Sequence, residues 1–158
     1  MSKAFTREDD DGGVAFAAGT RAVPERVTAL GARLARERLR EVAARLVHED
    51  AANHAQDRAA LDIEHQRLGA LAQAKVALIP HDTTVAAFGA QVRVRDARGK
   101  ERVVVLASAE EIGLVPNAAS VTAPIARALL GAHAGDDVEF EGPRGPEEVT
   151  VIDVSFPA

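Results

Sequence analysis

The sequence predicts an α+β fold: an N-terminal antiparallel helical hairpin (a coiled coil) followed by a small, mainly antiparallel β-sheet domain with one short helix. Three observations lead to this prediction. Apolar residues recur at helical spacing within residues 23–79, apolar and polar residues alternate in the second half, and a single proline-led apolar segment interrupts the predicted strands. We place the hairpin at 23–79, with its tip near 48–53, and the sheet domain at 85–156.

The segment before the hairpin differs in composition from the rest of the chain. Residues 1–22 are polar, contain glycine and carry an acidic run from Glu8 to Asp11, which predicts a disordered acidic tail. No apolar core of a signal peptide and no apolar run of membrane-spanning length is visible. We therefore expect a soluble, cytoplasmic protein without membrane contact.

Composition excludes several kinds of chemistry. The chain of 158 residues has no cysteine, which excludes disulfides, thiol catalysis and cysteine-bound zinc. Its net charge of −5 argues against a general nucleic-acid binder, which usually has a strong basic excess. With 3% aromatic residues, it also lacks the material for an aromatic ligand cage.

Two apolar stripes predict the two arms of the hairpin. Pro24 suits the first position of a helix, and a stripe follows it at Val27, Leu30, Leu34, Leu39, Val42 and Leu46. The second stripe consists of Leu61, Leu68, Leu71 and Leu78. One continuous helix would leave its stripe exposed unless the protein dimerised, whereas a chain that folds back lets each stripe bury the other.

Charge is distributed unevenly along the predicted hairpin. Residues 24–47 hold six arginines and three glutamates, whereas residues 48–65 hold five acidic residues and one arginine. A basic shaft with an acidic tip suits a location close to nucleic acid, although charge alone favours an ordinary solvated hairpin with ion pairs between its arms. A separate metal site at the tip, formed by residues such as His48, Asp50 and His54, is disfavoured because such side chains are common at polar turns.

The second half alternates with a period of two. Residues 90–96 and 101–107 predict a hairpin of strands around the turn ARGK, and further strands are expected at Ala118–Val121, Val138–Glu141 and Glu148–Val154. Between them, Pro124 predicts the start of a short helix, Ile125, Leu129 and Leu130 its apolar face, and Gly131 its end.

Three separated motifs in this half resemble the C-terminal domain of the GreA/GreB transcript-cleavage factors. They are Phe88-Gly89-Ala90, the run SVTAPIARALLG from Ser120 to Gly131, and Gly135-Asp136-Asp137-Val138. The resemblance implies an FKBP-like sheet domain that docks on RNA polymerase at the rim of its secondary channel. It also implies a bacterial regulator of transcription elongation, monomeric, whose hairpin enters the channel and contacts nascent RNA indirectly.

The resemblance further implies that carboxylates at the hairpin tip reach Mg²⁺ at the polymerase active site. The protein would then not be an enzyme, would have no cofactor of its own, and would at most stimulate RNA cleavage by the polymerase. In the segment LVHEDAANH, Glu49 matches the family's glutamate and Asp50 stands in place of its asparagine, and we take these two carboxylates as candidate Mg²⁺ ligands. Leu46 stands where the family has its first acidic residue, and we therefore expect weak stimulation of cleavage or none.

The same resemblance assigns polymerase docking to Thr122, Ala123 and Pro124. Ala123 replaces the family's serine and cannot cap the helix through a side chain, whereas Thr122 could cap a helix that started one residue early. We expect docking to be altered but retained.

Several alternatives stay open on the sequence alone. Within the family, the chain could be a non-cleaving or inhibitory homologue, or a shorter-armed relative that resembles the regulator of nucleoside diphosphate kinase. Outside it, an FKBP-like binding module or prolyl isomerase is disfavoured, because that activity uses an aromatic-lined pocket and the domain offers only Phe88, Phe140 and Phe156. A coiled-coil scaffold that dimerises through residues 61–78 would differ in its mass in solution.

Overall fold

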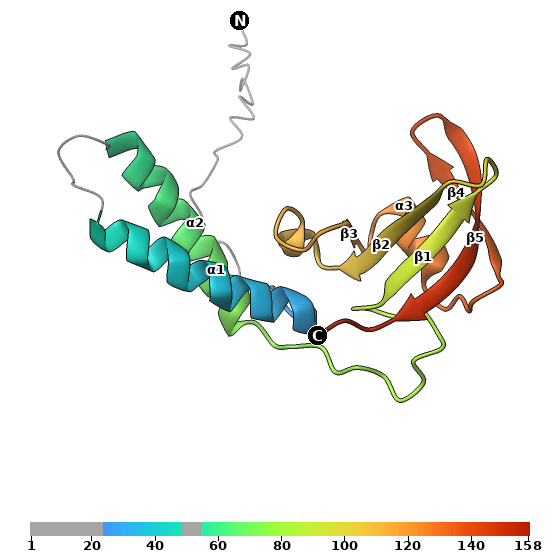
Figure 1. Cartoon of the computed structure of the whole chain (residues 1–158), viewed down its shortest axis with the longest axis horizontal. Coiled ribbons are helices and arrows are strands. Elements are labelled where there is room, and N and C mark those ends of the chain that lie inside the picture. The colour runs from blue at the N-terminus through green and yellow to red at the C-terminus, as the bar shows by residue number, and fades with distance from the viewer. Residues whose placement is uncertain (1–23, 49–54) are drawn as a thin grey trace, which may run out of the picture.

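The computed structural model describes residues 24–48 and 55–158 and places a helical hairpin beside a β-sheet domain (Figure 1). Helix α1 (Ala29–His48) and helix α2 (Ala55–Gln73) pack against each other in opposite directions. The predicted α+β fold with an antiparallel helical hairpin is thus confirmed. The predicted acidic tail, residues 1–22, lies outside the described residues.

The hairpin is held together by apolar side chains from both arms. Val42 of α1 and Leu61, Leu68 and Leu71 of α2 are buried in one cluster, against which Leu39 and Leu46 also pack. Small buried residues, Gly31, Ala32 and Ala35, occupy the first turns of α1. A helix surface without long side chains lets neighbouring groups approach the backbone closely.

The ends of both arms differ from the sequence prediction. Helix α1 begins at Ala29, five residues after Pro24, because the Thr28 hydroxyl accepts a hydrogen bond from the Gly31 N–H (2.9 Å) and so caps the helix. Just before it, Val27 pairs with Val76 in a β-bridge that closes the base of the hairpin. Helix α2 accordingly ends at Gln73, and Leu78, predicted for its stripe, is 90% exposed.

The sheet has five strands in the order β3-β2-β1-β5-β4. Only β2 and β3 run parallel, whereas the other neighbours are antiparallel. The strands are β1 (Gln91–Asp96), β2 (Glu101–Ala107), β3 (Ala118–Ser120), β4 (Asp137–Gly142) and β5 (Gly145–Ser155). The predicted turn between β1 and β2 is present: the Asp96 carboxylate accepts hydrogen bonds from the N–H groups of Arg98 and Lys100.

The two faces of β2 have different partners. Val104 and Leu106 point into the core of the sheet domain, which helix α3 (Pro124–Leu129) covers with Ala126 and Leu129. Val105 and Ala107 lie on the opposite face, in a second buried cluster. Because both faces are covered, the second half of β2 is buried at four consecutive positions.

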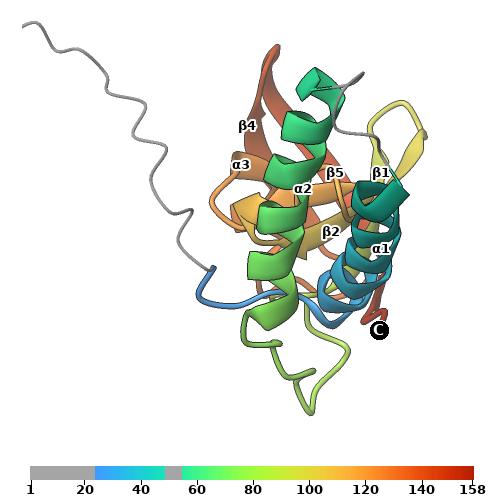
Figure 2. The same cartoon turned by 90° about the vertical axis from the view of Figure 1, so that its left-hand side faces the viewer.

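The second cluster joins the hairpin to the sheet domain. Leu30 and Leu34 of α1 pack against Val105, Ala107 and Val115. The prediction that these two leucines face the second arm is therefore wrong. The stripe of α1 is therefore divided: Leu30 and Leu34 pack against the sheet domain, whereas Leu39, Val42 and Leu46 pack in the cluster with α2. Figure 2 shows the hairpin in front of the sheet.

Candidate functional site

The start of helix α3 presents the three predicted docking residues. Pro124 occupies the first turn, and Ala123 precedes it with an extended backbone and no side-chain cap. Thr122 and Pro124 are exposed, whereas Ala123 is half-buried against the core of the sheet domain. The structure brings the three residues together at one corner, as their adjacency requires, but only two of them present their side chains fully to solvent.

Thr122 does not cap helix α3, contrary to one of the two possibilities that the sequence allows. Its hydroxyl lies 2.8 Å from the Ser120 hydroxyl, and its N–H donates to the same oxygen (3.3 Å). The Ala123 N–H donates to the Ser120 carbonyl (2.8 Å), which closes a turn. Ser120 therefore holds this corner in place, and the first N–H groups of α3 remain without a side-chain partner.

The other end of α3 is fixed by a glycine. Gly131 has a φ of 84°, a left-handed conformation that glycine adopts without strain, and its N–H donates to the Ala86 carbonyl (2.7 Å). Next to this stop, Leu130 is 41% exposed. The residue that caps the end of the short helix is thus an apolar side chain that the sheet domain covers only in part.

A shallow groove of about 730 Å³ runs between α3 and the base of the hairpin. Its walls come from three segments, namely Glu25, Arg26, Lys75, Val76, Ala77, Leu78 and Pro80 at the hairpin base, Ala86, Ala87 and Phe88 before β1, and Val121 and Leu130 around α3. Phe88 is the single aromatic residue in the lining, and the Arg26 guanidinium covers its ring at 4.4 Å. This lining does not provide the aromatic pocket of a prolyl isomerase.

The predicted tip residues, Glu49 and Asp50, lie outside the described residues. Leu46, the residue in place of the family's first acid, is half-buried and packs against the apolar cluster of the hairpin. Position 46 is thus part of the hairpin's internal packing.

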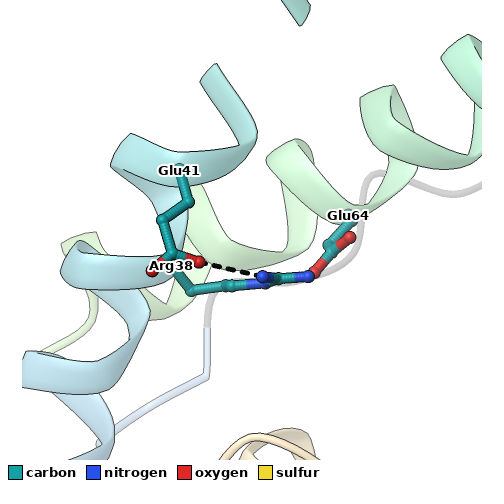
Figure 3. Close-up of polar contacts among 3 residues, drawn as sticks. All are labelled: Arg38, Glu41 and Glu64. Carbon is teal, nitrogen blue, oxygen red and sulfur yellow. Dashed lines mark hydrogen bonds and ion pairs between the residues drawn. The ribbon is translucent and has the colours of Figure 1, made fainter. Parts of the chain in front are cut away.

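Ion pairs lie on the surface of the hairpin shaft, as is expected of an ordinary solvated hairpin. Arg38 of α1 binds Glu41 one turn further on (2.9 Å) and Glu64 of α2 (3.0 Å), as Figure 3 shows. Its hydrogen bonds to Glu41 and Glu64 raise the pKa of the Arg38 guanidinium above its usual value. Because all three side chains are at least one-third exposed, these pairs contribute little to stability.

The remaining arginines of α1 leave a basic surface. Arg36, Arg40 and Arg45 are exposed and make no ion pair with any residue that the structure describes, whereas Arg33 pairs with Glu37 (3.0 Å). The predicted basic character of the first arm is therefore only partly neutralised by its own acids.

Neither a metal site nor a membrane span is found in the described part of the chain. Within residues 24–48 and 55–158, His, Asp and Glu side chains form no group of three suited to a metal ion. None of the helices described is both long and apolar enough to cross a bilayer.

A buried carboxylate that was not predicted from the sequence lies at the junction of hairpin and sheet domain. Glu111, which ends the 3-10 turn η1 (Ala109–Glu111), is fully buried. One oxygen, Oε1, accepts from the Thr28 N–H (2.9 Å) and hydroxyl (2.6 Å). The other, Oε2, accepts from the Ser108 N–H (2.9 Å) and hydroxyl (2.8 Å). The Ser-x-x-Glu spacing of a capping box was the only sequence signal for it.

Comparison with known proteins connects this arrangement to one family. The family described as "Transcription elongation factor, GreA/GreB, C-term" matches residues 81–156. The transcription elongation factor GreA of Anaeromyxobacter sp. is 31% identical over 118 residues, which cover 69% of this chain and 71% of that protein. GreA of Nitratidesulfovibrio vulgaris is 33% identical over 70 residues, and the alignment covers 44% of this chain but only 43% of that factor.

A solved GreA/GreB structure from Nitrosomonas europaea is 27% identical and covers 84% of this chain and 100% of that chain, with a TM-score of 0.42. The chain has two parts, a helical hairpin and a sheet domain, and its alignment with the GreA of Anaeromyxobacter is longer than the sheet domain alone. It belongs to the GreA/GreB family of transcription elongation factors. Membership in a family of elongation factors agrees with the prediction that the chain is not itself an enzyme.

Proposed function

We propose that this protein binds RNA polymerase and regulates transcription elongation, with its hairpin inserted into the secondary channel and its sheet domain docked at the rim. The observation that carries the proposal is the alignment with a GreA protein over 69% of this chain, which extends beyond the sheet domain. The proposed complex contains one copy of the protein, which approaches nascent RNA only through its hairpin.

The docking surface is the exposed corner before α3. Thr122 and Pro124 face solvent there, and the groove with Leu130 and Val121 in its walls lies beside them. Apolar groups next to a rigid, exposed turn are suited to a protein partner, because they lose water on binding. Arg36, Arg40 and Arg45 are exposed and make no ion pair with a described residue, so their charges suit a channel near nucleic acid.

Stimulation of RNA cleavage is the weaker part of the function. Glu49 and Asp50 are the candidate ligands for Mg²⁺ at the polymerase active site, where such an ion activates water against the transcript. Leu46 is apolar and packs inside the hairpin, so the tip lacks one of the spaced acids. Mg²⁺ binds weakly to an incomplete set of oxygen ligands. We therefore propose a factor that occupies the channel, stimulates cleavage by the polymerase weakly or not at all, and competes with active factors.

Binding is tested by titrating RNA polymerase with the protein and with the double variant Thr122→Arg, Pro124→Ala. The variant should bind at least tenfold more weakly, because a long charged side chain replaces a compact one at the corner. Ala97→Arg, which adds the same charge at the exposed turn between β1 and β2, serves as the control and should bind like the wild type. Equal affinities for all three proteins would refute the docking site.

Cleavage is tested on backtracked polymerase, with and without the protein, against the variant Glu49→Gln, Asp50→Asn. We expect little cleavage above the intrinsic rate and slower cleavage when the protein competes with an active GreA. Robust cleavage that disappears in the double variant would show instead that two adjacent carboxylates suffice.

A further inference from the structure

Both arms of the hairpin hold the same short turn of the sheet domain. From α1, the N-cap residue Thr28 donates two hydrogen bonds to the Glu111 carboxylate. From α2, Arg67 Nη2 donates to the carbonyl oxygens of Glu110 (3.0 Å) and Ile112 (2.7 Å). The turn η1 is therefore bound from two directions, next to the apolar contact of Leu30 and Leu34 with β2.

The backbone of α1 is adapted to this contact. Gly31 lies in the first turn of the helix, and a Cβ atom at its position would overlap with Oε1 of Glu111. A carboxylate is also the group that the N-terminus of a helix favours, because the unpaired N–H groups there are partly positive. Glycine at position 31 thus gives a charged group of another domain access to the helix start.

We infer that Glu111 is a positioning residue: its carboxylate fixes the direction in which the hairpin leaves the sheet domain. Two hydrogen bonds on each oxygen restrain the carboxylate in position and orientation, whereas apolar contacts alone would let α1 slide or tilt. One oxygen is held by the sheet domain through Ser108 and the other by the hairpin through Thr28. The carboxylate therefore transmits the orientation of one domain to the other.

The consequence for function rests on the proposed insertion into a channel. A hairpin whose direction is set before binding loses less orientational freedom when both its tip and the docking surface engage one partner. Loss of the hydrogen bonds between Glu111 and Thr28 should therefore weaken binding to the polymerase, although the docking residues themselves are unchanged.

The test measures the direction of the hairpin in the protein alone. The chain has no cysteine, so cysteines introduced at the exposed positions Ala44, on α1, and Ala97, in the β1–β2 turn, carry the only two spin labels. Their distance distribution is recorded for the wild type, for Glu111→Gln and for the matched control Glu110→Gln, which makes the same change at an exposed neighbour. A pair at Ala97 and Ala134 reports whether the sheet domain itself is intact.

In Glu111→Gln, an amide NH₂ replaces one acceptor and faces a backbone N–H, so the Ala44–Ala97 distribution should broaden at least twofold while the Ala97–Ala134 distribution stays narrow. Glu110→Gln should match the wild type. Thr28→Val, which removes the hydroxyl with little change of shape, should also broaden the Ala44–Ala97 distribution, and Thr28→Ser should not. Narrow distributions in folded Glu111→Gln or in folded Thr28→Val would overturn the inference.

Polymerase titration provides a separate reading of the consequence. The affinity of Glu111→Gln should fall at least threefold, and that of Glu110→Gln should not change. If the wild type fails to bind polymerase, the proposed function fails, yet the spin-label distances still decide whether Glu111 orients the hairpin. A broadened hairpin with wild-type affinity would contradict the consequence for binding.

Discussion

The base and the shaft of the hairpin use the same residue types in opposite ways. At the base, Glu111 is fully buried and accepts four hydrogen bonds from two domains. On the shaft, Glu64 accepts one bond from Arg38, and its side chain is 36% exposed. A carboxylate at the base thus determines how two parts of the protein meet, whereas a carboxylate on the shaft mainly keeps the surface polar.

This difference suits the proposed function, in which the hairpin reaches into a partner. The shaft needs a stable pair of helices and a surface with suitable charge, and many sequences satisfy both. The base needs one geometry, because a small change of angle at the start of a helix moves its far end by a much larger distance. We expect substitutions at the base to change the orientation of the hairpin, and substitutions on the shaft to change mainly its surface charge.

The largest effect is expected when the two carboxylates are removed in turn. Glu111→Ala leaves four donors without their acceptor in a buried site and should lower the free energy of unfolding by about 3 kcal/mol. Glu64→Ala removes an exposed ion pair and should cost about 0.5 kcal/mol. Urea unfolding followed by circular dichroism measures both, since the chain has no tryptophan or tyrosine. Similar losses at the two sites would remove the distinction between base and shaft.

Two helical glycines give the next largest difference. Alanine normally stabilises a helix relative to glycine by about 0.5–1 kcal/mol, and Gly69→Ala in α2 should follow this rule because nothing lies near its added methyl group. In Gly31→Ala the methyl group meets the Glu111 carboxylate. The free energy of unfolding should therefore fall by about 2 kcal/mol, because the contact between α1 and Glu111 is disturbed. A gain of stability in Gly31→Ala, measured by the same unfolding experiment, would contradict the contact between α1 and Glu111.

A smaller effect is expected at Arg38 on the shaft. Arg38→Gln keeps most of the side-chain length but removes the charge that binds Glu41 and Glu64, and it should cost about 0.5 kcal/mol at low salt. The cost should shrink further in 1 M salt, where such pairs are screened. A salt-independent loss would mean that the packing of the arginine stem, and not its charge, holds the arms together.

The sequence predicts the elements better than their junction. Period-two alternation locates the strands β1 and β2, and Pro124 and Gly131 bracket α3, because these are local signals with local causes. Leu30 and Leu34 belong to the same helical stripe as Val42, yet they pack against the sheet domain. Periodicity shows that a face is buried but does not name the surface that buries it.

In the candidate site, too, local features could be predicted from the sequence and contacts between distant residues could not. Thr122, Ala123 and Pro124 are neighbours in the chain, so their placement at one corner follows from the start of a helix. Thr28 and Glu111 are 83 residues apart, and no local pattern connects them. Gly31 does not predict the contact with Glu111 either, because a glycine inside a helix usually indicates no more than a weak helix former.

The smallest effect is expected in the exposed segment between hairpin and sheet domain, where Asp82 provides a third kind of carboxylate. Asp82 Oδ1 accepts hydrogen bonds from the Thr84 hydroxyl and from the Thr84 N–H (2.9 Å). These bonds, the one from the hydroxyl most, lower the pKa of Asp82 below its usual 3.8. A lowered pKa means that the turn is favoured above pH 3.8 and that this contribution is lost as the pH falls through the value in the folded protein. Thr84→Ala should raise the pKa of Asp82 and Thr84→Ser should leave it low, as measured by carbonyl NMR titration.

Unlike Glu111, Asp82 is exposed to solvent, so the spin-label distance between Ala44 and Ala97 should not change in either Thr84 variant. A change in that distance would show that the connecting segment, as well as the base, orients the hairpin.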